Sequence, residues 1–285
     1  MLWNKLSSMC WYGNDYLRSM RRVPRNYRMH NFLICDRDCR KSPLDVFTLA
    51  KSRSIEPDSD RTVTLLPLNI GRHFKFVRKA MDDDLIFQRK APVAVWRGVS
   101  TSSCWELNTT PNTSQALNCA RANLVKRWAT SEYNFVDVGL TEIVQIPDHE
   151  KWKYHQFLKP RMSLEDLLKF KYLVSVEGND VATNLKWALA SKSVVLMPKP
   201  TRETFILESN LRPWEHYVPV HPNMSDLEEK VKYCEANQHL CKQISDAATA
   251  YMKPFSRRDR LFNLGAKTFE EYVRMMWIAG VYDEM

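Results

Sequence analysis

Apolar runs separated by polar turns predict a succession of strands and helices along the chain. The clearest case is an apolar run over 172–176, followed by the turn Glu177-Gly178-Asn179-Asp180, a stretch of helical composition over 181–191, and a second apolar run over 193–197. Short apolar runs bounded by turn residues indicate buried strands. The order strand, helix, strand predicts two parallel strands that are neighbours in one sheet.

A unit of this kind is typical of ligand-binding proteins. The ligand lies beyond the carboxyl end of the first strand, where the amino terminus of the helix presents N–H groups to an anion. Gly178 allows the close approach of a backbone, and Lys186 supplies a flexible cation. These features suit the binding of the pyrophosphate of a nucleotide at the start of the helix. The alternative is that Asp180 only caps the helix, Gly178 only makes the turn, and Lys186 is a solvated surface charge.

Two earlier apolar runs end in residues suited to chemistry. The run 31–35 predicts a strand that ends in Asp36-Arg37-Asp38, and the run 93–96 predicts one that leads into Arg97-Gly98 and the hydroxyls of 100–103. A carboxylate at the carboxyl end of a strand can act as a general base. Guanidinium, glycine and small hydroxyls can bind phosphate or ribose. The alternative for 36–38 is a local ion pair beside a turn.

Three helix starts are predicted by a serine or threonine followed three residues later by an acidic residue, at Ser163, Ser225 and Thr268. The helix after Ser225 is expected to be amphipathic and structural. Strands that alternate with helices in both halves predict an α/β protein with two Rossmann-like lobes and a cleft between them. We expect an acceptor-side lobe over 1–90, a donor lobe over 91–254, and a last helix within 255–285 that packs back across the first lobe.

Charge and apolar content narrow the class of protein. The 285 residues carry a formal net charge of +9, which favours an anionic partner. The basic segment 18–28 could bind nucleic acid, although no nucleic-acid-binding motif accompanies it. No apolar run reaches the ~18 residues of a membrane span, and the first residues do not form a signal peptide. We therefore expect a cytoplasmic protein.

Two patterns could suggest a metal site, and we expect neither to be one. Asp82-Asp83-Asp84 looks like an Asp-x-Asp motif that holds a divalent ion. It follows basic residues instead of a buried strand, so a solvated acidic turn is expected. The seven cysteines contain no CxxC pair, and the spacing of the histidines near Cys234 and Cys241 is irregular, so no zinc site is expected. We predict no cofactor and no metal.

The Gly178 turn and the segment 211–220, LRPWEHYVPV, together resemble the carboxyl-terminal signature of glycosyltransferase family ninety. That family includes capsule and lipopolysaccharide sugar transferases and protein O-glucosyltransferases. The segment EGNDVATNLKW is similar to the corresponding sequence in compact bacterial and viral members such as xylosyltransferases. The resemblance implies a GT-B fold and an inverting, metal-independent transfer of a sugar from a UDP-sugar to a hydroxyl of a glycan or glycoconjugate. Xylose is the favoured sugar, and glucose is next.

The resemblance also implies roles for single residues. Asp38 stands at the family's Arg-Asp motif and is the expected catalytic base. Arg121 matches an arginine that opens a helix in the family, although 104–120 is inserted before it, and its plain interpretation is an exposed helix charge. Better-known eukaryotic members place serine and arginine where this chain has Ala182 and Asn184. The expected donor contacts are Arg97, Gly98, Thr101, Arg121, Gly178, Asn179, Asp180 and Lys186, with Glu203 or Glu208 on the ribose.

Two other functions stay open from the sequence alone. One is an α/β protein that binds nucleic acid through the segment 18–28. The other is a catalytically silent relative that keeps the fold and binds glycan. The sequence does not identify the acceptor or the oligomeric state.

Overall fold

The structure is a computed structural model, and it describes residues 33–39, 48–55, 63–67, 70–101, 120–132, 134–179 and 181–278. The chain divides into two compact units. Unit 1 comprises residues 1–72, 201–208 and 257–285, and unit 2 comprises residues 73–200 and 209–256. The two lobes expected from the sequence, with their boundary at residue 90, stay a prediction.

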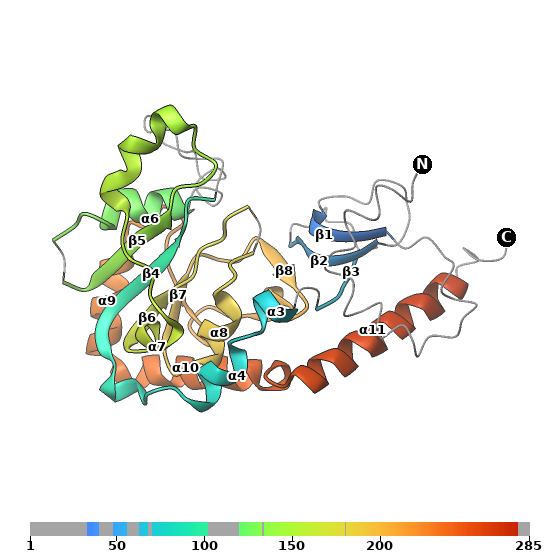
Figure 1. Cartoon of the computed structure of the whole chain (residues 1–285). Helices are drawn as coiled ribbons and strands as arrows, with labels where there is room; N and C mark the ends of the chain where they lie inside the picture. Colours follow the sequence, from blue (N-terminus) through green and yellow to red (C-terminus); the bar gives the residue numbers. More distant parts are fainter. Residues whose placement is uncertain are drawn as a thin grey trace. The chain divides into compact units, whose positions relative to one another are not determined.

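Unit 2 is built on a parallel sheet with the spatial order β5-β4-β6-β7-β9. Figure 1 labels β4, β5, β6 and β7 of this sheet. Its strands are β4 (Ala91–Val99), β5 (Val136–Glu142), β6 (Phe170–Val174), β7 (Val194–Met197) and β9 (Val218–Pro219). The predicted parallel pairing of the two strands around the Gly178 turn is confirmed, because Tyr172 pairs with Val194 and Leu173 with Val195. Unit 2 is therefore a mixed α/β structure with a parallel sheet, as the alternating pattern predicts.

The strands of unit 2 are mainly apolar because most of the residues on both faces of the sheet are buried. On one face, Ala94 and Trp96 pack with Leu124 of α6 and Val231 of α9 in one hydrophobic cluster. The alternate residues, such as Val95 and Leu173, point to the other face and are equally buried. The α-helices described in unit 2 are α4 (Val77–Asp82), α6 (Ala120–Trp128), α7 (Leu164–Leu167), α8 (Leu185–Ala190), α9 (Leu227–Ala236) and α10 (Gln238–Met252).

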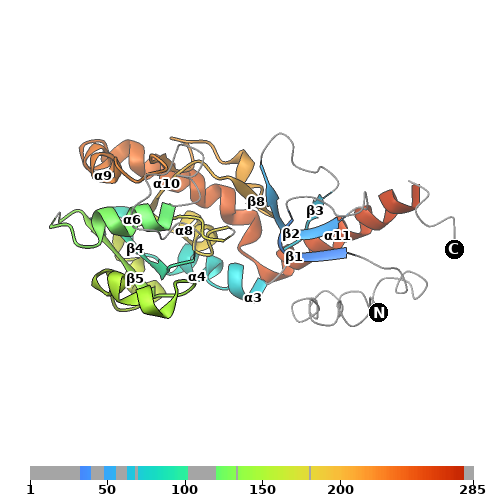
Figure 2. The same cartoon turned by 90° about the horizontal axis from the view of Figure 1, so that it is seen from above.

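The remaining elements of unit 2 are short or lie at its edge. Three 3-10 helices are η4 (Phe87–Arg89), η5 (Asp148–Phe157) and η7 (Lys253–Phe255). Figure 2 shows α9 and α10 running one after the other along one side of unit 2. In α9 the predicted apolar face is confirmed, because Leu227, Val231 and Cys234 are all buried.

Of the three predicted helix starts, one is confirmed. Ser163 caps α7, and its hydroxyl accepts a hydrogen bond from the Asp166 N–H at 3.0 Å. The start at Ser225 is wrong, because the residue that precedes α9 is Asp226, whose side chain makes no capping bond. The start at Thr268 is also wrong, because this residue lies inside α11 and donates its hydroxyl to the Leu264 carbonyl at 3.0 Å.

Unit 1 contains a smaller sheet. Strands β1 (Leu33–Cys39), β2 (Thr48–Ser54) and β3 (Val63–Leu65) are parallel in that order, and β8 (Arg202–Thr204) pairs antiparallel with β2. The other elements are α3 (Ile70–His73) and η6 (Glu208–Asn210), which each cross a boundary between the units, and α11 (Arg258–Ile278). Along α11, Leu261, Phe269 and Tyr272 are buried.

The first strand of unit 1 extends beyond the apolar run that predicts it. The apolar run covers 31–35, and the predicted strand ends in Asp36-Arg37-Asp38 before a polar turn through Ser42-Pro43. In the structure β1 continues to Cys39, and an irregularity in the pairing with β2 falls between Cys35 and Asp38. An extra residue in one strand lets pairing resume beyond a break in the hydrophobic pattern, which is why the polar residues remain in the strand.

Candidate functional site

The order of the strands in unit 2 identifies one edge of its sheet as the place for a ligand. The chain enters the sheet at β4, continues to β5 on one side, and then crosses to β6 on the other side of β4. Where the strand order reverses in this way, the carboxyl ends of the two strands leave a crevice in which ligands bind. Thr101 follows β4, Gly178 follows β6, and Arg121 is the second residue of α6.

The side chain of Arg121 bridges the ends of both strands. Its Nη1 donates to the Val99 carbonyl of β4 at 3.1 Å, and its Nη2 donates to the Val176 carbonyl beyond β6 at 3.4 Å. Nη1 also donates to the hydroxyl of Thr101. The interpretation of Arg121 as an exposed helix charge is therefore wrong, since the guanidinium is half-buried and fixed at the carboxyl edge of the sheet.

Gly178 lies directly against this group. A Cβ atom on Gly178 would lie 2.6 Å from the Thr101 hydroxyl oxygen, 2.8 Å from Arg121 Cζ and 3.0 Å from Arg121 Nη1. Only a residue without a side chain leaves these two groups in place. The structure thus brings together three of the predicted donor-binding residues, and it shows that the close approach at Gly178 is made by Arg121 and Thr101.

The connection after Gly178 is longer than predicted. The helix expected over 181–191 begins only at Leu185, because Asn184 binds the end of the preceding strand. Its Nδ2 donates to the Val174 carbonyl at 2.9 Å, and its Oδ1 accepts from the Ser175 hydroxyl at 3.1 Å. No contact of Asn184 was predicted. An asparagine before an apolar helix is a common capping signal, and here that polar side chain ties the helix start to β6.

Lys186 is buried. It is the second residue of α8, 1% of its surface is exposed, and its Nζ lies 5.4 Å from the centroid of the Phe74 ring. The interpretation of Lys186 as a solvated charge is therefore wrong, while its predicted contact with a phosphate stays a prediction. Asn179 is exposed, and Asp180 lies outside the described residues.

Arg97 lies on the face of β4 opposite to Trp96, because successive strand residues alternate. Its Nη2 pairs with Asp137 Oδ2 at 2.7 Å, and further bonds reach the carbonyls of Asp137 and Pro160. Burial raises the pKa of Asp137, but the hydrogen bonds from Arg97 and Lys159 outweigh it and hold that pKa below its usual value. Arg97 thus joins β4 to β5, and its predicted donor contact stays a prediction.

The two glutamates predicted for the ribose belong to unit 1, and both are buried. Glu203 on β8 accepts from Arg53 Nε of β2 at 2.7 Å. Glu208 accepts from the backbone N–H of Thr204 at 2.5 Å and from its hydroxyl at 2.9 Å. Both carboxylates thus take part in contacts that hold β8 and the residues after it. Their binding to a ribose stays a prediction.

Asp38, the expected base, belongs to β1 of unit 1. Its backbone is in register with Ser52 of β2, near the carboxyl end of both strands. Its side chain lies outside the described part of the chain, so its role stays a prediction. The basic segment 18–28 also lies outside the described residues.

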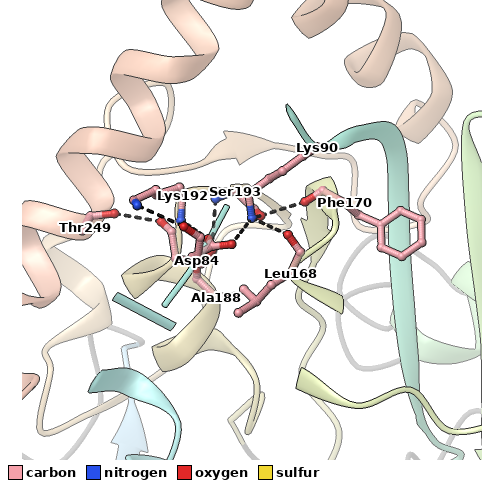
Figure 3. A network of polar contacts seen from close by, with 9 residues as sticks. Asp84, Lys90, Leu168, Phe170, Ala188, Lys192, Ser193 and Thr249 are labelled. Carbon is pink, nitrogen blue, oxygen red and sulfur yellow. Dashed lines mark hydrogen bonds and ion pairs between the residues drawn. The ribbon is translucent and has the colours of Figure 1, made fainter. Parts of the chain in front are cut away.

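The acidic run 82–84 is not the solvated turn that the sequence predicts. Asp82 and Asp83 are exposed, but the Asp84 side chain is fully buried and accepts from Lys90 Nζ at 2.5 Å. Figure 3 shows the network around this pair: Lys90 Nζ also donates to the Leu168 carbonyl and to Ser193 Oγ, and the Lys192 N–H donates to Asp84. Asp84 is therefore a structural residue that joins the α4–β4 connection to the α8–β7 connection.

Among the residues that the structure describes, no group of three or more His, Cys, Asp or Glu side chains could hold a metal ion. Cys234 and Cys241 are buried free thiols. Within the same residues, every helix is too short or too polar to cross a membrane.

Comparison with known proteins finds a matching family model and several similar sequences. The sequence model of the family described as Glycosyl transferase family 90 matches residues 51–281 of the chain. The O-glucosyltransferase LpsA of Dichelobacter nodosus is 31% identical over 207 residues, which covers 73% of this chain and 56% of LpsA. The uncharacterized protein 035R of Invertebrate iridescent virus 3 is 29% identical over 206 residues, which covers 68% of this chain and 17% of 035R.

A mammalian protein matches a shorter part of the chain. Protein O-glucosyltransferase 3 of Rattus norvegicus is 34% identical over 138 residues, which covers 48% of this chain and 26% of the rat protein. The chain thus spans 56% or less of each of these three relatives. All of the residues that form the Thr101, Arg121 and Gly178 group fall inside the range matched by the family.

Proposed function

The chain belongs to glycosyl transferase family 90, and from this premise we propose that it transfers a sugar from a UDP-sugar to a hydroxyl of a glycan or glycoconjugate. The proposed transfer inverts the configuration at the anomeric carbon and needs no metal. The proposal includes a GT-B arrangement of two lobes.

The observation that carries this proposal is the group formed by Thr101, Arg121 and Gly178 at the carboxyl edge of the parallel sheet. An arginine remains charged at all relevant pH values, and its planar guanidinium suits two phosphate oxygens. Hydrogen bonds from Arg121 to two carbonyls and one hydroxyl hold its guanidinium at this edge. A cation held at a strand-order reversal supports the binding of a diphosphate there.

In the proposed reaction Asp38 takes the proton of the acceptor hydroxyl. The hydroxyl oxygen then bonds to the anomeric carbon while the bond from that carbon to the UDP oxygen breaks, and UDP leaves with that electron pair. Attack from the side opposite to UDP inverts the anomeric centre. Arg121 stabilises the charge that develops on the departing diphosphate, and the role of Asp38 rests on the family's Arg-Asp motif.

The donor sugar is the finer part of the proposal. The amino-acid sequence around Gly178 favours UDP-xylose as the donor, with UDP-glucose next. Two matched relatives are named as O-glucosyltransferases, which supports testing glucose beside xylose. Arg97, Gly98, Asn179, Asp180 and Lys186 are further proposed contacts of the donor, and Glu203 or Glu208 is proposed for its ribose.

A donor panel tests the function. The protein is incubated with UDP-xylose, UDP-glucose, UDP-galactose or UDP-N-acetylglucosamine, and both UDP release and the unfolding temperature are measured. A ligand that binds only the native state raises stability by RT ln(1 + [L]/Kd). We expect stabilisation by UDP and UDP release from xylose or glucose donors. Stabilisation by single-stranded RNA, with no effect of any UDP compound, would overturn the proposal in favour of a nucleic-acid-binding protein.

A further inference from the structure

Trp96 lies beneath the guanidinium of Arg121. It is 97% buried on the face of β4 that α6 covers, with only 3% of its surface exposed. The Cζ atom of Arg121 lies 5.9 Å from the centroid of the Trp96 ring. This distance is within the range over which a guanidinium is attracted to the electron-rich face of an indole, and tryptophan is the aromatic residue that binds a cation most strongly.

Gly98 makes room for this indole. Residues 96 and 98 point to the same face of β4 because side chains alternate along a strand. A Cβ atom on Gly98 would lie 2.9 Å from Cη2 of Trp96, and closer still to Cζ2. The six-membered ring of the indole therefore occupies the space that a side chain at position 98 would fill. The ring thus extends toward the carboxyl end of β4, where Thr101 and Arg121 lie.

We propose that Trp96 is a positioning residue that holds the Arg121 guanidinium at the donor site, and that Gly98 is required for the indole to do so. This inference rests on the proposed binding of UDP at the Thr101, Arg121 and Gly178 group. It adds a second role for Gly98 to the donor contact proposed for it.

The proposed role of Trp96 is to limit the motion of the long Arg121 side chain before UDP binds. Three hydrogen bonds hold the edges of the guanidinium, and its Cζ atom lies over the Trp96 ring. The attraction between the cation and the ring adds a restraint on the position of the guanidinium. A guanidinium that is already immobile before UDP arrives loses less conformational entropy on binding, so the preorganised site binds more tightly.

The test is the affinity for UDP, measured by titration calorimetry on the whole chain. We expect Trp96→Leu and Gly98→Ala each to weaken UDP binding by about 5- to 30-fold, the range of a partly desolvated cation–π contact. Trp96→Phe keeps an aromatic ring and should recover most of the affinity. The matched control is Phe87→Leu, because Phe87 is an equally buried aromatic residue of the same cluster that contacts Tyr172.

A double-mutant cycle separates positioning from general loss of packing. In an Arg121→Ala background, Trp96→Leu should weaken UDP binding by less than about twofold, because the group it positions is gone. Equal UDP affinity in Trp96→Leu, Phe87→Leu and the wild type would overturn the inference, and so would an undiminished effect of Trp96→Leu without Arg121. If Trp96→Leu does not fold, Gly98→Ala in the two backgrounds decides in the same way. A wild-type protein that does not bind UDP would overturn the proposed function as well.

Discussion

Gly178 is the residue at which the candidate site depends most on the absence of a side chain. A methyl group there would press on the Thr101 hydroxyl and on Arg121 Cζ. Arg121 Cζ lies near the end of a long side chain, so the fold can yield by moving Arg121. We expect Gly178→Ala to weaken UDP binding about tenfold or more, equal to about 1.4 kcal/mol, and to change the free energy of unfolding by less than about 1 kcal/mol.

The matched control for Gly178→Ala is Gly71→Ala. A Cβ atom on Gly71 would meet no atom within 4 Å, and this glycine lies in the helix α3. The control should leave UDP affinity unchanged, since only a crowded glycine is expected to affect the site. Equal UDP affinities in the two variants would show that the contact at Gly178 has no part in binding.

Asp38 is the residue on which the proposed chemistry depends. Asp38→Asn keeps the size of the side chain but removes its basicity, so we expect UDP affinity to stay nearly intact. Turnover should fall by about two to four orders of magnitude, the usual effect of losing a general base. The measurement is UDP release in the presence of a true acceptor.

Asp36→Asn serves as the control for Asp38, because Asp36 belongs to the same strand and carries the same charge. It should lower turnover far less. Near-normal turnover in Asp38→Asn, or a loss confined to Asp36→Asn, would place the base elsewhere.

The predicted residues differ in how well the sequence could place them. Thr101, Arg121 and Gly178 follow strands or open a helix, so strand order alone brings them to one edge. Arg97 and Glu203 form ion pairs with partners that are 40 and 150 residues away in sequence. No local pattern shows such a partner, and a charge that looks available in the sequence can therefore be engaged in the fold.

At the scale of elements, the strand–turn–helix unit around Gly178 was predictable because its apolar runs are continuous and its turn is polar. The start of α8 was not predictable from that pattern. It is set by Asn184, whose side chain binds the carbonyl of Val174 at the end of β6. The capping pattern alone also did not locate every helix start, since the pattern at Thr268 occurs in the middle of α11.

The network in Figure 3 gives a stability prediction at the same scale. Burial lowers the pKa of Lys90, while the hydrogen bond that Lys90 donates to Asp84 opposes that shift. Asp84→Asn would leave the buried Lys90 ammonium without its counter-charge. We expect a loss of about 3–5 kcal/mol in the free energy of unfolding, the usual cost of removing one partner from a buried ion pair. Urea unfolding measures it.

Asp83→Asn is the control for Asp84, because it changes the neighbouring exposed carboxylate in the same way. Its effect should stay within about 0.5 kcal/mol. If the two variants were equally stable, the Asp84–Lys90 pair would contribute nothing to the fold, and the structural role assigned to Asp84 would be wrong.

For the whole molecule, we predict that sugar transfer does not depend on a divalent ion. The charge on the leaving diphosphate is expected to be met by Arg121 and other cationic side chains. Turnover with the preferred donor should therefore be unchanged after exhaustive treatment with EDTA. Complete loss of turnover that manganese restores would contradict the metal-independent mechanism.

The central claim is that a UDP diphosphate binds the Arg121 guanidinium at the carboxyl edge of the parallel sheet in unit 2. Titration of UDP into the wild type, Arg121→Ala and Arg127→Ala tests it most directly. Arg127 lies in the same helix and is exposed, so its variant removes the same charge from outside the site. We predict wild-type affinity in Arg127→Ala and a loss of about 1.5–3 kcal/mol in Arg121→Ala, as expected for charge-assisted hydrogen bonds. No binding of UDP by the wild type, or equal affinity in the two variants, would contradict the claim.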